Sequence, residues 1–336
     1  MHAETGVHIK PLACRLYPFV PTPGAESVRL DLRADCPSVA ANRGRPLHVH
    51  QQAIGQFAEE TVTRPMRILP AWGGERPLTV QEFEAVVSAF EGLLSRTPLS
   101  LRGRLRAGTI LLDLLYAARI SKVRDERFVE MMDLLAQAVV QEAQSDEQQR
   151  PGLSLRPGRL FRQWLFLHAI ADDPADLEAG RLQRWRRSWT RYRQSRRFVE
   201  ASGPIPPLRP DWPPTEFEAV DRVDRGDDAD LEPLIRSMRV KLEAHAFCGP
   251  GYYGYDLLGG LTALWLLPAV VGWFARLAAV AAGRSVLSAD DLMAGLRRAH
   301  HTFGVSPVFA RISERLRLKA LARPGIAGRL LDRYGP

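Results

Sequence analysis

Apolar residues recur at helical spacing along most of the chain, from about residue 50 to its end. They return every three or four positions, the period of one face of an amphipathic helix. The predicted helices cover residues 79–96, 101–118, 124–143, 159–170, 231–245, 256–282, 288–301 and 307–322. Strand patterns are nearly absent from this part of the sequence. We therefore predict a mainly α fold with a bundle-like helical body.

The helix predicted over residues 79–96 carries a start signal. Thr79 precedes the apolar repeat, and Glu82 follows three positions later. This is the spacing of a capping box, in which each side chain accepts a hydrogen bond from the backbone amide of the other residue. The Asp-Asp-Pro sequence at 172–174 is a stop signal for the helix before it, because proline cannot continue a helix.

Residues 1–48 have a different, irregular pattern. Prolines that prevent long helices are spread through them: Pro11, Pro18, Pro21, Pro23, Pro37 and Pro46. One short alternating run, SVRLDL at 27–32, places Val28, Leu30 and Leu32 on one face and predicts a half-buried strand. We expect a small, irregular N-terminal region that contains one or two short strands.

A proline-rich stretch divides the helical part of the chain in two. Residues 203–214 read GPIPPLRPDWPP, a composition that gives a stiff connector. We therefore divide the chain into an N-terminal region over 1–48, a helical domain over 49–202, the connector over 203–215, and a second helical segment over 216–336. We expect the second segment to pack on the first.

The longest apolar segment lies between Leu257 and Ala275, where nineteen residues carry no charge. This length only just reaches that of a membrane-spanning helix. Several glycines and Pro268 interrupt the segment, and helices of a soluble type are predicted on both sides of it. A buried central helix with a kink at Pro268 is the favoured interpretation, and we expect no membrane span.

Composition is that of a soluble globular protein, with 336 residues of which 46% are hydrophobic and 25% charged. The net charge of +8 can indicate a nucleic-acid partner. However, four of the 46 basic residues are lysines, and such an arginine excess is what a GC-rich coding sequence gives. The opening MHAETGVHIK has no apolar core of a secretory signal, and three cysteines are too few for a disulfide scaffold. We expect a cytoplasmic protein in a reducing environment.

An arginine-rich segment over residues 180–198 also contains aromatic residues. Trp185, Trp189 and Tyr192 fall on one stripe of a helix, and Leu182 extends the stripe. The favoured interpretation is an amphipathic helix with this stripe in the core and the arginines in solvent. The alternative is a phosphate-binding face. We favour the first and expect no nucleic-acid partner, while a protein substrate or partner is compatible with the sequence.

Glycines at Gly249, Gly251 and Gly254 match the G-x-G-x-x-G pattern of phosphate-binding turns. In such a turn, backbone amides at a helix start bind a phosphate or the carboxylate of a nucleotide-like cofactor. The pattern is specific only after a strand, and here a helix is predicted before it. A helix–helix turn is therefore favoured, and the three glycines are a weak candidate for cofactor binding.

The positions of the histidines and a search for known catalytic motifs show which classes of enzyme the sequence does not indicate. His168 lies in an apolar sequence and is expected to be a core residue, while His300 and His301 point to different faces of one helix. No G-x-S-x-G, H-E-x-x-H or P-loop sequence occurs. The sequence therefore gives no indication of a hydrolase or an NTPase.

Cys14 and Cys36 are candidate metal ligands. One loop and the predicted strand separate them, so that a metal ion could bridge the two. Thiolates are soft ligands that suit zinc or the iron of an iron–sulfur cluster. His2 and His8 could complete a Cys2His2 zinc site, although their spacing is not that of a known zinc finger.

The sequence around these cysteines resembles the later part of the YkgJ-type cysteine-cluster domain, also described as a zinc- or iron-chelating domain. Residues 11–19, PLACRLYPF, match its P-x-x-C-R-x-Y-P-F element, and Cys36 and Pro37 match its closing C-P. His2 matches a position that holds His or Tyr. The resemblance covers residues 1–48 and implies that Cys14, Cys36 and, more weakly, His2 bind an iron–sulfur cluster or zinc.

The early cysteine group of that family is missing from this sequence. We expect the chain to begin inside the domain, through a start codon assigned too late or a true truncation. The complete protein would then hold the metal. The alternative is that this chain by itself binds no metal.

Some relatives of this family carry a long helical region after the cluster, as this chain does. That layout resembles the FliB-like flagellin lysine-N-methylases and implies, as an alternative, protein lysine methylation with S-adenosylmethionine. Nothing in the helical part matches that chemistry residue by residue, so no catalytic residue is assigned. A third alternative is a helical interaction protein with a vestigial metal site. The favoured prediction is a metal-binding cysteine-cluster protein whose biochemical activity the sequence does not reveal.

Overall fold

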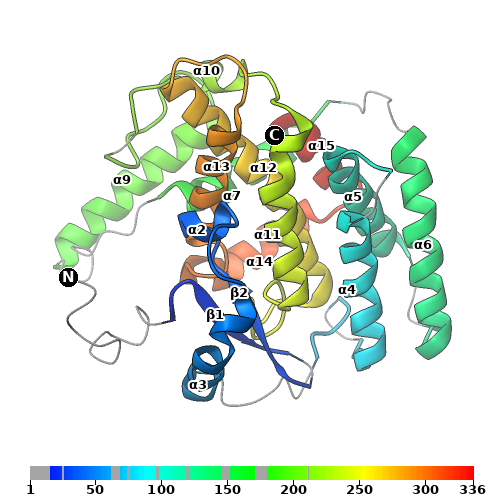
Figure 1. Ribbon diagram of the computed structural model, residues 1–336. Coiled ribbons are helices and arrows are strands. Elements are labelled where there is room, and N and C mark those ends of the chain that lie inside the picture. Colours follow the sequence, from blue (N-terminus) through cyan, green and yellow to red (C-terminus); the bar gives the residue numbers. More distant parts are fainter. Residues whose placement is uncertain are drawn as a thin grey trace.

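The computed structural model confirms the mainly α fold (Figure 1). It describes residues 16–24, 26–61, 69–73, 76–95, 98–118, 122–145, 152–170, 180–210 and 212–336. Up to the proline-rich connector the elements are β1 (Phe19–Pro23), β2 (Val28–Leu32), α2 (Pro37–Ala40), the 3-10 helix η2 (Leu47–His50), α3 (Gln51–Thr61), α4 (Val80–Ser95), α5 (Leu101–Ala117), α6 (Asp125–Ser145), α7 (Leu155–Ala169) and α9 (Arg181–Glu200). After it come α10 (Phe217–Asp221), η4 (Asp228–Leu231), α11 (Glu232–Glu243), α12 (Leu257–Ala281), α13 (Ala289–Thr302), η5 (Pro307–Ala310), α14 (Ile312–Leu321) and α15 (Ile326–Tyr334).

Strands β1 and β2 form the predicted small N-terminal sheet, an antiparallel hairpin. Its register runs from Phe19 opposite Leu32 at the open end to Pro23 opposite Val28 at the turn. The two faces of β2 meet different partners, because successive side chains of a strand point in opposite directions. Val28 and Leu30 line a groove between the hairpin and α3, whereas Asp31 between Leu30 and Leu32 is buried on the side where β2 contacts α11.

Helix α12 forms the centre of the molecule, as predicted for the longest apolar segment. It begins at Asp256, whose side chain accepts a hydrogen bond from the Gly259 amide at 2.6 Å, and it continues through Pro268. It is the one helix among the described residues that is long and apolar enough to cross a membrane. However, 94% of that apolar stretch is buried inside the protein. The side chains of Trp265 and Trp273 lie entirely within the core.

Elements from both sides of the connector contribute to one hydrophobic core. Phe90 of α4 packs on Trp265 with ring centroids 4.4 Å apart, and Phe198 of α9 packs on Trp273 at 5.1 Å. The connector itself folds back on α12, since Trp212 contacts Trp273. The second helical segment therefore packs on the first.

The capping box predicted at the start of α4 is present. The Thr79 amide donates to Glu82 Oε2, and the Glu82 amide donates to Thr79 Oγ1, both at 3.1 Å. Glu82 is fully buried and also binds Arg76 and Arg124, each at 2.8 Å. Burial alone would raise the pKa of Glu82, but the Thr79 amide and the nearby arginines outweigh it and lower that pKa. One side chain thus caps the N-terminus of α4 and pairs with two arginines.

Helix α9 corrects the prediction for the arginine-rich segment. The segment is helical, but Trp185, Trp189 and Tyr192 are 65%, 54% and 53% exposed instead of lying in the core. Phe198, near the end of the helix, is the residue that enters the core. Helical periodicity reveals that a stripe exists, but it does not reveal which stripe meets the rest of the protein.

Gly295 of α13 packs closely against the backbone of α12. We expect Gly295→Ala to lower the free energy of unfolding by about 1–3 kcal/mol. A Cβ there would lie 2.8 Å from the Ala275 amide nitrogen of α12, which belongs to a rigid backbone. This clash outweighs the gain of about 1 kcal/mol that alanine brings to a helix interior. Urea unfolding measures the difference.

Gly92→Ala in α4 is the matched control, because nothing lies within 4 Å of a Cβ at that position. The propensity gain should be realised there, and the variant should be as stable as the parent protein or more so. If Gly295→Ala and Gly92→Ala stabilise the protein equally, the close packing of α12 and α13 is refuted.

Candidate functional site

A cavity of about 760 Å³ lies at the open end of the hairpin and contains the predicted ligand Cys36 in its wall. Tyr17, just before β1, and Phe19, the first residue of β1, line the cavity, and Arg236 lines it from α11. His50, at the end of η2, also lines the cavity and contacts Phe19 with ring centroids 5.5 Å apart. The cavity wall therefore holds one cysteine and one histidine among its described residues.

Cys36 occupies the N-cap position of α2, directly before Pro37. Proline suits the first turn of a helix, because a backbone amide at that position would have no hydrogen-bond acceptor within the helix. The Cys36 side chain is half-buried and does not cap the helix. In contrast, Cys248 is fully buried, and burial raises the pKa of its thiol well above the ordinary value. Of these two thiols, Cys36 is the more accessible one.

Tyr17, Arg33 and Asp35 surround Cys36 with polar groups. Burial, the charge of Asp35 and a hydrogen bond with the Cys36 side chain together raise the pKa of Tyr17 to about 12. Arg33 donates to both carboxylate oxygens of Asp35, at 3.0 and 2.5 Å. Burial opposes ionisation of Asp35, but hydrogen bonds from His301 and Arg33 outweigh it and lower its pKa to about 2. This cluster fixes the segment that carries Cys36.

A buried ion pair joins β2 to the helical body behind the cavity. Lys241 Nζ of α11 lies 2.5 Å from Asp31 Oδ2, and the two side chains are 4% and 6% exposed. His300 of α13 is buried as well, and its pKa is lowered well below the ordinary value by burial and by the charge of Lys241. Such buried charges are found at functional sites and at interfaces that must hold one geometry.

Hydrogen bonds hold the turn end of the hairpin against α11. Thr22 Oγ1 donates to the Ala244 carbonyl at 2.6 Å, and Arg29 donates to the Glu243 carbonyl at 3.0 Å. Arg29 also binds Glu84 of α4 at 2.7 Å. The turn end of the hairpin is thus fixed by contacts with distant parts of the sequence, as at Thr22–Ala244 with a separation of 222 positions.

The described residues do not by themselves complete a metal site. Among them, no group of three or more histidine, cysteine, aspartate or glutamate side chains is close enough to hold a metal ion. Cys36 and His50 line the cavity, but Cys14 and His2 lie outside the described residues. His50 was not predicted as a ligand, since nothing in the local sequence distinguishes it from His48. A complete site needs further ligands from residues 1–15 or from elsewhere.

The glycine-rich turn joins α11 to α12 and uses its backbone groups internally. The Gly249 amide donates to the Tyr255 carbonyl at 2.8 Å, and the Gly254 amide donates to the Gly249 carbonyl at 2.7 Å. A Cβ at Gly251 would lie 2.6 Å from the His245 carbonyl oxygen, so the turn is closely packed. Cofactor binding by these glycines stays a prediction, and the amides of Gly249 and Gly254 already have partners.

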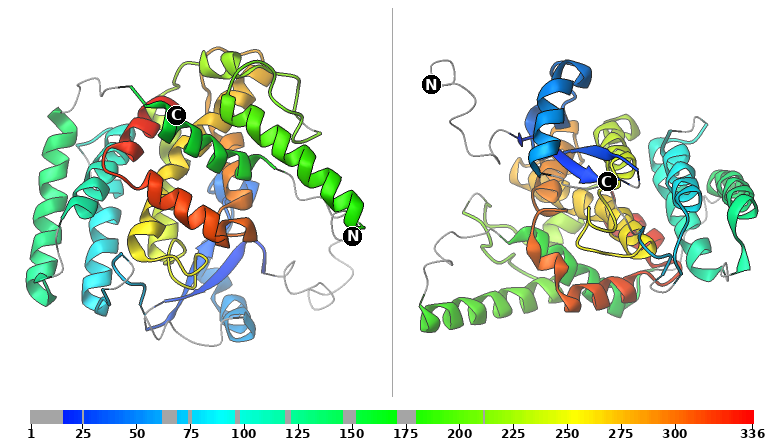
Figure 2. Two further views of the ribbon diagram at one scale, coloured as in Figure 1. Left: turned by 180° about the vertical axis from the view of Figure 1, so that it is seen from behind. Right: turned by 90° about the horizontal axis from the view of Figure 1, so that it is seen from below.

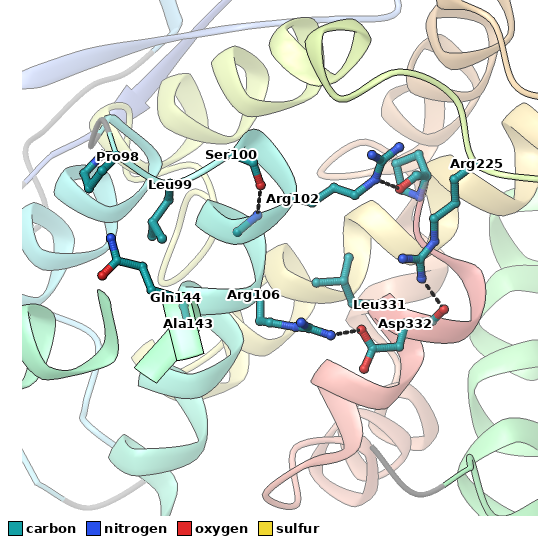
Figure 3. Close-up of a pocket in the computed structure, with 12 residues that line it drawn as sticks. Pro98, Leu99, Ser100, Arg102, Arg106, Ala143, Gln144, Arg225, Leu331 and Asp332 are labelled. Carbon is teal, nitrogen blue, oxygen red and sulfur yellow. Dashed lines mark hydrogen bonds and ion pairs between the residues drawn. The ribbon is translucent and has the colours of Figure 1, made fainter. Parts of the chain in front are cut away.

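A second cavity, of about 350 Å³, lies between the start of α5 and the C-terminal residues (Figure 3). Arg102 donates to the Pro336 carbonyl at 3.2 Å, and Arg106 binds Asp332 at 2.9 Å. Arg225 donates to the backbone carbonyl of Asp332 (Figure 3). Arg102 and Arg106 therefore hold the C-terminal residues against α5, and Arg225 holds them against the segment between α10 and η4.

Comparison of the chain with protein-family models, curated proteins and solved structures finds no match. The resemblance of residues 1–48 to the cysteine-cluster domain therefore stays a prediction. The geometry around Cys36 is what the structure adds to it.

Proposed function

We propose that this chain is a metal-binding protein of the cysteine-cluster type, with Cys14 and Cys36 as thiolate ligands of zinc or of an iron–sulfur cluster. The observation that carries the proposal is the position of Cys36, half-buried in the wall of a large cavity at the open end of the hairpin. The chain enters β1 at that same end, because Phe19 pairs with Leu32.

The short separation in sequence between Cys14 and Tyr17 supports a common site for the two sulfurs. Tyr17 forms a hydrogen bond with the Cys36 side chain, and Cys14 is three residues before Tyr17 in the sequence. Three residues span at most about 11 Å, which is compatible with a site shared by the two sulfurs.

The electrostatic surroundings suit an anionic group such as a thiolate-bound metal. Arg43, Arg45 and Arg236 line the cavity, and no acidic residue is among its described lining residues. Positive charge near the cavity is favourable for an anionic metal–thiolate group. When bound, the metal would supply either a structural cross-link or an electron-transfer centre.

Metal content of cysteine variants tests the proposal. In the protein extended by any upstream coding sequence that contains further cysteines, Cys14→Ser and Cys36→Ser should each remove most of the metal, because a hydroxyl is a hard ligand and a poor substitute for a soft thiolate. Cys248→Ser is the matched control and should keep the metal, since Cys248 is buried between helices. Metal content that falls equally in all three variants would show that the site has been placed wrongly.

The coding sequence ahead of Met1 separates this proposal from a vestigial site. An in-frame group of cysteines there would supply the ligands that the described residues lack. A stop codon directly ahead of Met1, together with a metal-free protein, would leave a helical interaction protein as the remaining interpretation.

A further inference from the structure

Helix α9 extends beyond the helices it packs on (Figures 1 and 2). Its C-terminal part is anchored through Phe198, whose ring contacts Phe166, Phe217 and Trp273 with centroids 5.6, 5.2 and 5.1 Å apart. Its N-terminal part, which carries Trp185 and Trp189, extends beyond the rest of the helical body (Figure 2). This part of α9 is therefore available to a partner.

An exposed apolar stripe runs along that part of the helix. Leu182 and Trp185 are each 65% exposed, and Trp189 and Tyr192 are 54% and 53% exposed. At 100° per residue, all four lie on the side of the helix roughly opposite Phe198, and so away from the core. The rings of Trp185 and Trp189 are nearly parallel, at 9°, and Tyr192 continues the row. Large apolar side chains exposed together usually mark a binding surface.

Helix α14 adds two aliphatic residues on the same side of the molecule. Both α9 and α14 pack on α7, and both lie in front when the molecule is seen from behind (Figure 2). Ile312 and Leu316, one turn apart on α14, are 76% and 63% exposed. We refer to Leu182, Trp185, Trp189, Tyr192, Ile312 and Leu316 together as the rear apolar face.

The rear apolar face is set in strong positive charge. Helix α9 contains eight arginines and one acidic residue, Glu200, and residues 311–323 contain five basic residues and one acidic residue, Glu314. Arg186 and Arg193 of α9 and Arg311, Lys319 and Arg323 of the α14 region are exposed. A partner that covers this face must therefore be both apolar and negatively charged.

We propose that the rear apolar face docks on the surface of a bilayer that contains anionic lipids. Tryptophan and tyrosine are favoured at the boundary of headgroups and acyl chains, and arginines beside them bind anionic headgroups. Single-stranded nucleic acid is the competing partner, because its bases stack on aromatic rings. Ile312 and Leu316 decide between the two, since aliphatic side chains insert among acyl chains but do not form stacking platforms. The protein would lie on the membrane, with α12 remaining buried in its core.

Sedimentation of the purified full chain with vesicles tests the proposal. We expect binding to vesicles of phosphatidylcholine mixed with phosphatidylglycerol, and much weaker binding to vesicles of phosphatidylcholine alone. Arg186→Gln with Arg193→Gln should lower the partition coefficient about 25-fold, or about fivefold per arginine. Trp185→Ser with Trp189→Ser, and Ile312→Ser with Leu316→Ser, should each lower it at least tenfold.

Matched controls lie on α6, away from this face. Leu134 is 65% exposed and Arg127 is also exposed, so Leu134→Ser and Arg127→Gln should leave vesicle binding within twofold of the parent protein. A single-stranded oligonucleotide is tested in parallel. The proposal is overturned if the anionic vesicles do not bind, if the control variants lose as much binding as the variants of the rear face, or if the oligonucleotide binds and the vesicles do not.

Discussion

Lys241→Met is expected to lower the free energy of unfolding by about 3–5 kcal/mol. The substitution leaves Asp31 buried, 6% exposed, without the ammonium group that lies 2.5 Å from it. An unpaired carboxylate in such a site must either stay desolvated or take up a proton, and both cost free energy. Burial already raises the pKa of Asp31, although the charge of Lys241 opposes that shift. Urea unfolding, followed by circular dichroism, measures the loss.

The double variant Asp31→Leu with Lys241→Met separates loss of the pair from loss of the fold. It removes both charges and should recover most of the lost stability, because an apolar pair is often as stable as a buried ion pair. Arg196→Met is the surface control, since Arg196 and Glu200 are 66% and 57% exposed and 3.9 Å apart. That variant should change stability by less than about 1 kcal/mol. A Lys241→Met protein as stable as the Arg196→Met protein would contradict the docking of the hairpin described here.

Acid is expected to destabilise the protein through His168. Burial and the charge of Arg298 lower the pKa of His168 from 6.5 to about 3, while the unfolded chain keeps the ordinary value. Below pH 6.5 the unfolded state therefore binds a proton that the folded state does not, and stability falls until the pH reaches the folded pKa of about 3. Within this window each pH unit costs about 1.4 kcal/mol for this histidine. Above pH 6.5 the contribution of His168 to stability is fully present.

His168→Gln tests that assignment. Glutamine has no charge at any pH in this range and can replace the hydrogen bond that His168 Nδ1 makes with Thr302 Oγ1 at 2.6 Å. Its free energy of unfolding should fall less steeply below pH 6.5 than that of the parent protein. His48→Gln is the control, because His48 is exposed, and it should follow the parent curve. Parallel curves for the His168→Gln and parent proteins would refute the role of His168 in acid unfolding.

Features encoded by neighbouring residues could be predicted from the sequence. The capping box needs only Thr79 and Glu82, three positions apart, and both of its hydrogen bonds are present. The apolar run from Leu257 has no polar stripe, so it fits a helix buried on all sides, and α12 is that helix. Helix α15, however, was not predicted. The helical pattern predicted from the sequence ended at residue 322, whereas Gly325, with φ of 78°, is the N-cap of a further helix.

Features that depend on distant residues could not be predicted. The partners Asp31 and Lys241 are 210 positions apart, and nothing around Asp31 indicates that a charged face of β2 is buried. The predicted orientation of α9 was wrong for a related reason, since Phe198 and not Trp189 contacts the aromatic residues of α12. The sequence did identify Cys36 as a candidate, but it gave no indication of the cavity, which arises only when the hairpin docks on α11.

The docking of the hairpin connects the proposed metal centre with the helical body. Asp35, next to Cys36, binds Arg33 of the hairpin and lies 3.5 Å from His301 of α13. Asp31, on the same strand segment, binds Lys241 of α11. A metal held at Cys36 would therefore be rigidly attached to the centre of the molecule, which is the geometry needed if the helices shape a site around it or present it to a partner.

X-ray absorption at the metal edge tests the central claim most directly. It is measured on the protein extended by its upstream coding sequence, purified without oxygen, beside its Cys36→Ser variant. We predict bound zinc or iron with sulfur neighbours at about 2.3 Å, and fewer sulfur neighbours or no metal in Cys36→Ser. A metal shell made only of oxygen and nitrogen, or a sulfur shell unchanged by Cys36→Ser, would contradict the assignment of this site.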